Sequence, residues 1–125
     1  MQNDFSIGKF LFDWHGRISR KEFWLGTIAI GIIQSFIFIF IFILSPDLLS
    51  RVSFIHYIII IFAAYIFFAF ITIVLYIKRY HDLDKSGHWV WLLLIPIIGA
   101  LWILIEGGFF RGTIGSNKYG KDTVK

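Results

Sequence analysis

Hydrophobic residues dominate three long stretches of this chain, residues 23–44, 52–77 and 89–105, and none of the three contains Lys, Arg, Asp or Glu. The stretches are 22, 26 and 17 residues long. A helix needs about 20 apolar residues to cross the ~30 Å hydrocarbon core of a bilayer. The pattern therefore predicts an all-α integral membrane protein with three transmembrane segments, of which the third is at the lower limit of length.

The polar residues divide what remains of a single membrane domain, residues 1–125. Residues 1–22 mix aromatic and aliphatic side chains with charged ones, which is typical of a segment that lies on the membrane surface. Residues 106–125 form a polar, glycine-rich tail. Hydrophobic residues make up 58% of the chain, above the 45–50% of soluble domains, which supports a bilayer as the solvent.

Basic residues indicate the orientation. Four precede the first apolar stretch, one lies in the first loop, three in the second and four in the tail. Because basic residues near span ends favour the cytoplasm, we expect a cytoplasmic N-terminus. Three complete crossings would place the tail outside. A re-entrant hairpin that turns at Pro96 and Gly99 would keep it inside, and the sequence leaves both topologies open.

Small and polar side chains recur on one face of each long apolar stretch, and we expect these two faces to pack together. Small residues let helices approach closely, and a polar side chain in hydrocarbon needs a partner. Apart from Gly31 and Ala69, the same side chains would line a polar path if the protein formed an oligomeric channel or transporter. The residues are Thr27, Gly31, Gln34 and Ser35 in the first stretch, and Tyr65, Ala69, Thr72 and Tyr76 in the second.

The densest polar cluster is the predicted second loop, residues 78–88. Imidazole and carboxylate groups there suit Zn²⁺ or Mn²⁺, and His81 and Asp82 are weak metal candidates, with Asp84 and His88 nearby. Neighbouring positions on a helix point apart, however. We therefore favour ion pairs of Arg79 and Asp82 with each other or with the N-terminal segment, and we predict no bound metal or cofactor. The chain has no cysteine, which excludes thiolate chemistry.

Several motifs together resemble the bacterial domain-of-unknown-function family 805, over residues 12 to 122. His88-Trp89 stands where Gly-Trp is more usual, and Asp122 near where the family often has Pro. The resemblance implies a small inner-membrane protein and no settled activity. The motifs are Phe12-Asp-Trp-His-Gly-Arg-Ile-Ser-Arg-Lys-Glu-Phe-Trp24, Arg79-Tyr-His-Asp82 with Ser86-Gly87-x-Trp89, Pro96-x-x-Gly99, and Gly115-x-Asn117-x-Tyr119-Gly120.

We expect the polar residues of these motifs to form a cluster that binds lipid head groups at membrane level, because Arg forks suit phosphate. Arg17 or Arg20 is expected to pair with Asp82, and Arg79 with Glu22. Ser19 and Glu22 also have the spacing of a helix capping box. The predicted cluster consists of Arg17, Arg20, Glu22, Arg79, His81, Asp82 and Asn117.

Three functions follow in order of preference. The first is a scaffold, regulatory or lipid-binding module that acts as a homo-oligomer or with another membrane protein. The second is the channel or transporter already described. The third, which we disfavour, is a lipid-acting or metal enzyme built on His15, Arg79, His81 and Asp82. The expected partners are anionic membrane lipids and not nucleic acid, because the basic residues flank the spans.

Overall fold

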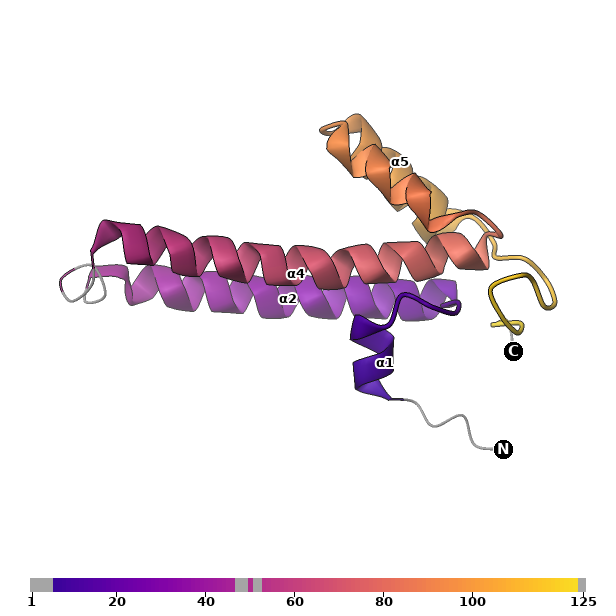
Figure 1. The fold of residues 1–125 in the computed structure, drawn as a ribbon, viewed down its shortest axis with the longest axis horizontal. Coiled ribbons are helices and arrows are strands. Elements are labelled where there is room, and N and C mark those ends of the chain that lie inside the picture. Colours follow the sequence, from indigo (N-terminus) through magenta and orange to yellow (C-terminus); the bar gives the residue numbers. More distant parts are fainter. Residues whose placement is uncertain (1–5, 47–49, 51–52, 124–125) are drawn as a thin grey trace.

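A computed structural model describes residues 6–46, 50 and 53–123. Figure 1 shows α2 and α4 side by side along the long axis, with the shorter elements and the tail gathered at one end of this pair. The elements, in chain order, are α1 (Ile7–Phe12), α2 (Arg20–Ile43), α4 (Phe54–Asp82), the 3₁₀ helix η1 (Gly87–Leu94) and α5 (Ile98–Phe109).

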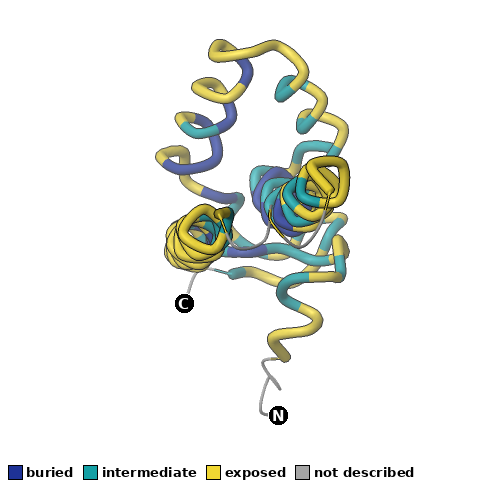
Figure 2. Tube along the Cα trace, turned by 90° about the vertical axis from the view of Figure 1, so that its left-hand side faces the viewer, coloured by how far each residue is buried: buried dark blue, intermediate teal, exposed yellow. Residues whose placement is uncertain are grey.

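Helices α2 and α4 are both long and apolar enough to cross a membrane. They contain 24 and 29 residues, or about 36 and 43 Å at 1.5 Å per residue, which exceeds the hydrocarbon thickness. Many residues of both helices are exposed (Figure 2), and the large hydrophobic side chains among them are mainly Ile and Phe. With its 12 residues, α5 is shorter. The structure is thus all-helical, with two helices of membrane-spanning length.

Helix α4 continues through Asp82, so the prediction of a loop from residue 78 was wrong for its first five residues. Lys78, Arg79, Tyr80, His81 and Asp82 are all buried on this last part of the helix. Because α1, α5 and the tail pack around it, the charged end of α4 is enclosed by protein.

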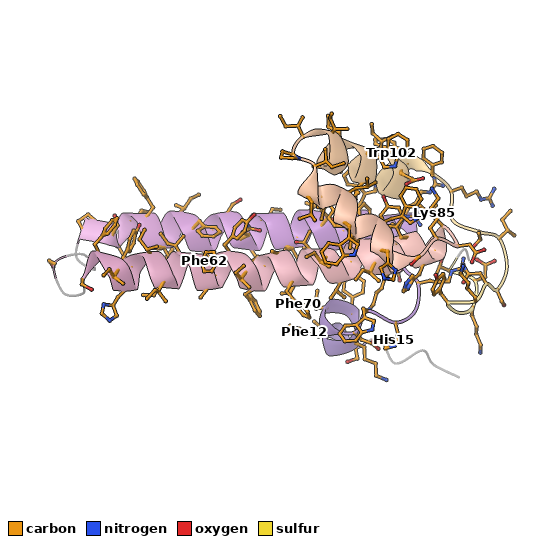
Figure 3. All side chains as sticks on the ribbon, turned by 45° about the horizontal axis from the view of Figure 1, so that its top comes forward. Phe12, His15, Phe62, Phe70, Lys85 and Trp102 are labelled. Atoms are coloured by element: carbon orange, nitrogen blue, oxygen red, sulfur yellow. The ribbon has the colours of Figure 1, made fainter. Side chains whose placement is uncertain are left out.

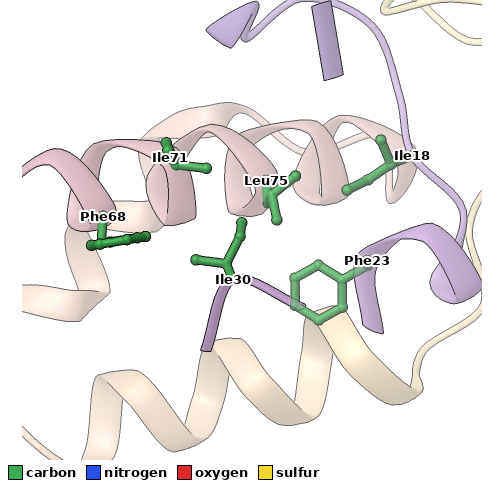
Figure 4. Packing of buried hydrophobic residues seen from close by; sticks show 6 residues of the cluster. All are labelled: Ile18, Phe23, Ile30, Phe68, Ile71 and Leu75. Atoms are coloured by element: carbon green, nitrogen blue, oxygen red, sulfur yellow. The ribbon is translucent and has the colours of Figure 1, made fainter. Parts of the chain in front are cut away.

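Apolar packing between α2 and α4 is concentrated near the end that carries the shorter elements. Gly26 of α2 allows close approach there, since a Cβ at this position would crowd Leu75 of α4 and Phe10 of α1. The segment before α2 contributes one residue to this cluster. Its buried members, drawn in Figure 4, are Ile18, Phe23, Ile30, Phe68, Ile71 and Leu75.

The small-residue stripe of α2 does not face α4, in contrast to the prediction. A Cβ at Gly31 would meet nothing within 4 Å, and Ser35 is exposed. Tyr65, on the stripe of α4, is 57% exposed. The residues of α2 that pack against α4 are Phe23, Gly26 and Ile30. Gly26 and Ile30 lie one position before the stripe residues Thr27 and Gly31, whereas Phe23 lies one turn before Thr27. The other residues of the two stripes are partly buried: Thr27, Gln34, Ala69, Thr72 and Tyr76.

The Ser and Thr hydroxyl groups on these stripes are satisfied within their own helices. Thr27 donates to the Phe23 carbonyl at 2.7 Å, and Ser35 to the Gly31 carbonyl at 2.8 Å. Thr72 does the same to the carbonyl four residues before it, at 2.9 Å. Such bonds remove the need for a partner on another helix, which explains why these side chains do not direct the packing.

The third apolar stretch is two helices joined by a turn, and a single span over residues 89–105 is not confirmed. Pro96 cannot donate a helical hydrogen bond, and Ile97 has a positive φ of 64°. The chain therefore reverses between η1 and α5, which contact each other. Beyond α5 the tail returns to α4, where the Thr113 amide donates to the Asp82 carbonyl at 2.8 Å. Both ends of the stretch thus lie at the same end of α4.

Gly99 is where the hairpin is tightest, because a Cβ there would overlap the Leu92 carbonyl oxygen. We expect Gly99→Ala to lower the free energy of unfolding by about 1–3 kcal/mol or more through this backbone overlap. Gly31→Ala is the matched control, since it adds the same methyl group to a helix in open space. Chemical denaturation in detergent measures both, and equal stability of the two variants would contradict the hairpin geometry.

Candidate functional site

The carboxylate of Asp82, at the end of α4, is the centre of a buried ion cluster. Its side chain is 1% exposed. One oxygen accepts from the Arg17 Nε at 3.0 Å and from the Thr123 hydroxyl at 2.6 Å. The other accepts from Nη1 of Arg79, three residues earlier on α4. One carboxylate therefore balances two guanidinium groups from different segments. Gly112 lies directly against it, since a Cβ there would overlap the carboxylate.

Arg17 connects the segment before α2 to the tail. Its side chain is 1% exposed. Nη1 donates to the Gly115 carbonyl at 2.8 Å and to the Gly120 carbonyl at 3.3 Å. Nη2 donates to the Thr113 carbonyl at 2.7 Å and to the Thr113 hydroxyl at 3.0 Å. Gly115 and Gly120 have positive φ, which allows the tail to curl around the guanidinium. All three nitrogens of Arg17 thus bond to protein.

The end of α5 is capped by side chains of the two long helices. The last carbonyls of a helix have no partner within it, and within a membrane each unpaired group costs several kcal/mol. Arg79 donates from Nε and Nη2, Trp24 from Nε1 at 3.1 Å, and Arg20 from Nη1 at 3.3 Å. The accepting carbonyls are those of Gly107 and Phe110 for Arg79, Gly108 for Trp24, and Phe109 for Arg20.

His81 and Asn117 attach the tail to the other side of α4. The His81 ring stacks on Tyr119 with centroids 3.9 Å apart and planes 5° from parallel. Its Nδ1 lies 3.2 Å from the Gly16 carbonyl oxygen. The Asn117 amide donates to the His81 carbonyl at 2.8 Å. These contacts and those of Arg17 bring the N-terminal segment, α4 and the tail together.

The predicted pairing of Arg17 with Asp82 is seen, as is the alternative in which Arg79 pairs with Asp82. Arg79 does not pair with Glu22 among the contacts of the described residues. Instead, Glu22 and Ser19 form the predicted capping box: the Ser19 amide donates to Glu22 at 2.7 Å and the Glu22 amide to Ser19 at 3.3 Å. Arg20 caps α5 and does not bond to Asp82.

The described residues contain no group of three or more His, Cys, Asp or Glu placed to hold a metal ion. Asp82 faces two arginines, Asp84 lies 3.9 Å from Lys118, and Nδ1 of His88 is 2.7 Å from the Ser86 hydroxyl.

In the N-terminal segment, the His15 amide donates to Asp13 at 2.9 Å. This bond, with that of the His15 ring, lowers the pKa of the Asp13 carboxyl.

Two buried groups were not anticipated from the sequence. Glu106 of α5 pairs with Lys85 and accepts from the Trp102 Nε1 at 3.1 Å, and Figure 3 labels Lys85 and Trp102 at this end of the molecule. Lys78 donates to two carbonyls in α1, those of Lys9 at 2.6 Å and Phe10 at 3.1 Å. The signal for Glu106 was its position next to an apolar stretch, where a carboxylate needs a partner.

A basic cleft of about 760 Å³ opens between the first turn of α2 and the tail. The N-terminal turn of a long helix favours anions through its free amides and dipole. Arg17 is committed to the ion cluster, whereas the other four basic side chains are exposed. Three of the four, Lys21, Arg111 and Lys121, make no ion pair or hydrogen bond with another described residue. The basic lining residues are Arg17, Arg20, Lys21, Arg111 and Lys121, and the acidic ones are Glu22, Asp82 and Asp122.

These features define a class: a small helical membrane protein with an ion cluster and a basic cleft at one end of two long apolar helices. Residues 11–121 match the family described as Protein of unknown function (DUF805), and the chain belongs to this family. The resemblance stated from the motifs is therefore confirmed.

Curated relatives align with most of this chain, and two of them are named as inner membrane proteins. The chain is 35% identical to Inner membrane protein YhaI of Escherichia coli over 98% of this chain and 95% of the relative. It is 32% identical to Inner membrane protein YhaH of the same organism, over 87% and 85%. Uncharacterized protein YiiR of Escherichia coli is 29% identical, over 94% and 90%. No solved structure matches the chain. The relatives and the two apolar helices support the predicted inner-membrane location.

Replacing the central carboxylate tests the ion cluster. Asp82→Asn keeps the shape but leaves two buried guanidinium groups without a counter-charge, so we expect a loss of about 3–5 kcal/mol in unfolding free energy. We also expect faster tryptic cleavage of the tail at Lys118 and Lys121, because the tail detaches. Asp84→Asn is the matched control and should change stability by less than about 0.5 kcal/mol. Equal effects of the two substitutions would contradict a central role for Asp82.

Proposed function

We propose that this protein is a small inner-membrane module that binds anionic lipid head groups through their phosphates in the basic cleft. The observation that carries this proposal is the set of exposed cations on the cleft, Arg20, Lys21, Arg111 and Lys121. A phosphate there would meet these side chains and the N-terminal turn of α2 together.

The position of the cleft favours a lipid as the source of the phosphate. The cleft lies at the start of α2. The exposed apolar surface of this helix begins nearby, at Leu25 and Ile28. A head group bound there would leave its acyl chains beside this apolar surface. Of the predicted head-group residues, Arg17, Glu22, Arg79, His81, Asp82 and Asn117 bond within the protein. Arg20 has one bond, from Nη1 to the Phe109 carbonyl, and its exposed guanidinium keeps other donors for a ligand.

We also propose that the η1–α5 hairpin is re-entrant and that both termini are cytoplasmic. This arrangement is supported by the tail contacts with Arg17, in the segment before α2, and with Asp82, at the end of α4. It also gives eleven basic residues inside and one outside, the asymmetry typical of inner-membrane proteins. The homo-oligomer expected from the sequence stays a prediction.

Lipid binding is tested on purified protein with phosphatidylglycerol against phosphatidylcholine, by native mass spectrometry. Each basic side chain near the head groups contributes about 1 kcal/mol. We therefore expect the triple variant Lys21→Gln, Arg111→Gln, Lys121→Gln to lose phosphatidylglycerol binding by roughly 100-fold, and the wild-type preference to weaken with salt.

A matched pair of single substitutions separates the cleft from general surface charge. Lys121→Gln should weaken binding about fivefold. Lys118→Gln, on the same tail but outside the cleft, should leave it unchanged. Equal effects of the two, or a wild type that binds both lipids alike, would count against the cleft as the binding site.

The orientation is tested by cysteine labelling, which is simple because the chain has no native cysteine. A membrane-impermeant maleimide should label Ser50→Cys in intact cells. It should label Ser116→Cys only after the inner membrane is permeabilised, because the re-entrant hairpin keeps the tail inside. Labelling of Ser116→Cys in intact cells would instead indicate three crossings.

A further inference from the structure

A second pocket lies between α4 and η1, and it shares no lining residue with the basic cleft. Its volume is about 460 Å³, within the range of small-molecule sites. None of its lining residues is Lys, Arg, Asp or Glu, so it does not favour a charged ligand. Its walls are mainly aliphatic and aromatic, with contributions from Ile73, Ile77, Leu93, Trp14, Trp91 and Tyr119.

One polar atom distinguishes this pocket from a simple apolar groove. Nδ1 of His81 lies 3.2 Å from the Gly16 carbonyl oxygen. Because a carbonyl can only accept, Nδ1 carries the hydrogen, and Nε2 of the neutral ring is left as an acceptor. His81 is 9% exposed and lines the pocket, and no donor among the described residues bonds to its Nε2. A ligand that carries a hydroxyl or N–H donor would supply the partner that this acceptor lacks.

The surroundings of His81 hold its ring in place and keep Nε2 accessible. Stacking on Tyr119 fixes the plane of the ring on one side. Gly87 leaves space beside the nitrogen: a Cβ there would lie 3.4 Å from Nε2 and 2.9 Å from the Ile77 side chain. The hydroxyl of Ser86, which also lines the pocket, lies 2.7 Å from Nδ1 of His88. The unpaired acceptor is thus a built feature of the pocket.

We propose that this pocket binds an uncharged, membrane-soluble aromatic alcohol, of the phenol or quinol type, whose hydroxyl donates to Nε2 of His81. The aromatic body fits the rings of Trp14, Trp91 and Tyr119, which favour offset or edge contacts with another ring. A plain acyl chain would fill the apolar volume but leave Nε2 unpaired. This site is separate from the basic cleft, so the two binding activities stand or fall independently.

The probe pair is 2-naphthol, which has one hydroxyl donor, and 2-methoxynaphthalene, which has none. Binding is measured to the full chain in lipid nanodiscs, with empty nanodiscs subtracted. We expect saturable binding of 2-naphthol, at least fivefold tighter than 2-methoxynaphthalene, as one neutral hydrogen bond provides. Equal affinity for the two probes, or no saturable binding above empty nanodiscs, would overturn the proposal.

Two substitutions locate the bound probe. Leu93→Trp fills the pocket without touching His81 chemistry and should weaken 2-naphthol binding at least tenfold. Leu101→Trp, at a residue of α5 that is 52% exposed, is its matched control and should bind as the wild type does. His81→Phe retains an aromatic ring against Tyr119 and should bind both probes alike. Unchanged discrimination in His81→Phe, or unchanged affinity in Leu93→Trp, would contradict the site.

A competition experiment identifies the natural chemistry. A short-chain ubiquinol should displace 2-naphthol, whereas the corresponding ubiquinone, which lacks the hydroxyl donor, should not displace it at the same concentration. Displacement by both forms would show that the donor is irrelevant. Displacement by neither would exclude membrane quinols as ligands of this pocket. The preference for 2-naphthol over 2-methoxynaphthalene would then still support a site for simpler phenols.

Discussion

The arrangement of this protein depends on the carboxylate of Asp82, which lies buried between the guanidinium groups of Arg17 and Arg79. Buried charges are tolerated only when they are paired and hydrogen-bonded. Arg79 lies on α4 together with Asp82, whereas Arg17 comes from the segment before α2, so the full pairing of Asp82 requires this segment and α4 to meet. The tail joins them because it bonds to Arg17 through its carbonyls and to Asp82 through Thr123.

The bilayer adds a second constraint, which the same side chains satisfy. With 12 residues, α5 is shorter than the hydrocarbon core of a bilayer. The last carbonyls of this helix need hydrogen-bond donors from elsewhere in the protein. Arg79, Arg20 and Trp24 supply them from α4 and α2. Because Arg79 serves both the carboxylate and α5, the hairpin and the tail are coupled at one residue. The basic cleft and the apolar pocket share no lining residue.

The sequence predicted the parts of this arrangement that depend on local rules or on charge. The capping box set the start of α2 at Ser19 and Glu22. The need of Asp82 for a cation indicated Arg17 or Arg20, and Arg17 is the one that pairs with it. The Arg79–Glu22 pair failed because Glu22 is occupied by the cap.

The packing face of α2 was misassigned for a different reason: in a lipid-facing helix the buried and exposed residues are equally apolar, so periodicity does not separate them. The cleft cations Lys21 and Arg111 lie far apart in the sequence, so no motif spacing predicts that they line the same cleft.

The most direct test of this account is the distance between the first turn of α2 and the tail in a bilayer. Pulsed electron paramagnetic resonance between spin labels at Lys21→Cys and Lys121→Cys, in lipid nanodiscs, measures it. The two positions line the same cleft, so the account predicts one narrow distance distribution well below the ~30 Å hydrocarbon thickness. A distribution centred at or beyond that thickness would mean that the third apolar stretch crosses the membrane and that the ion cluster does not gather these segments.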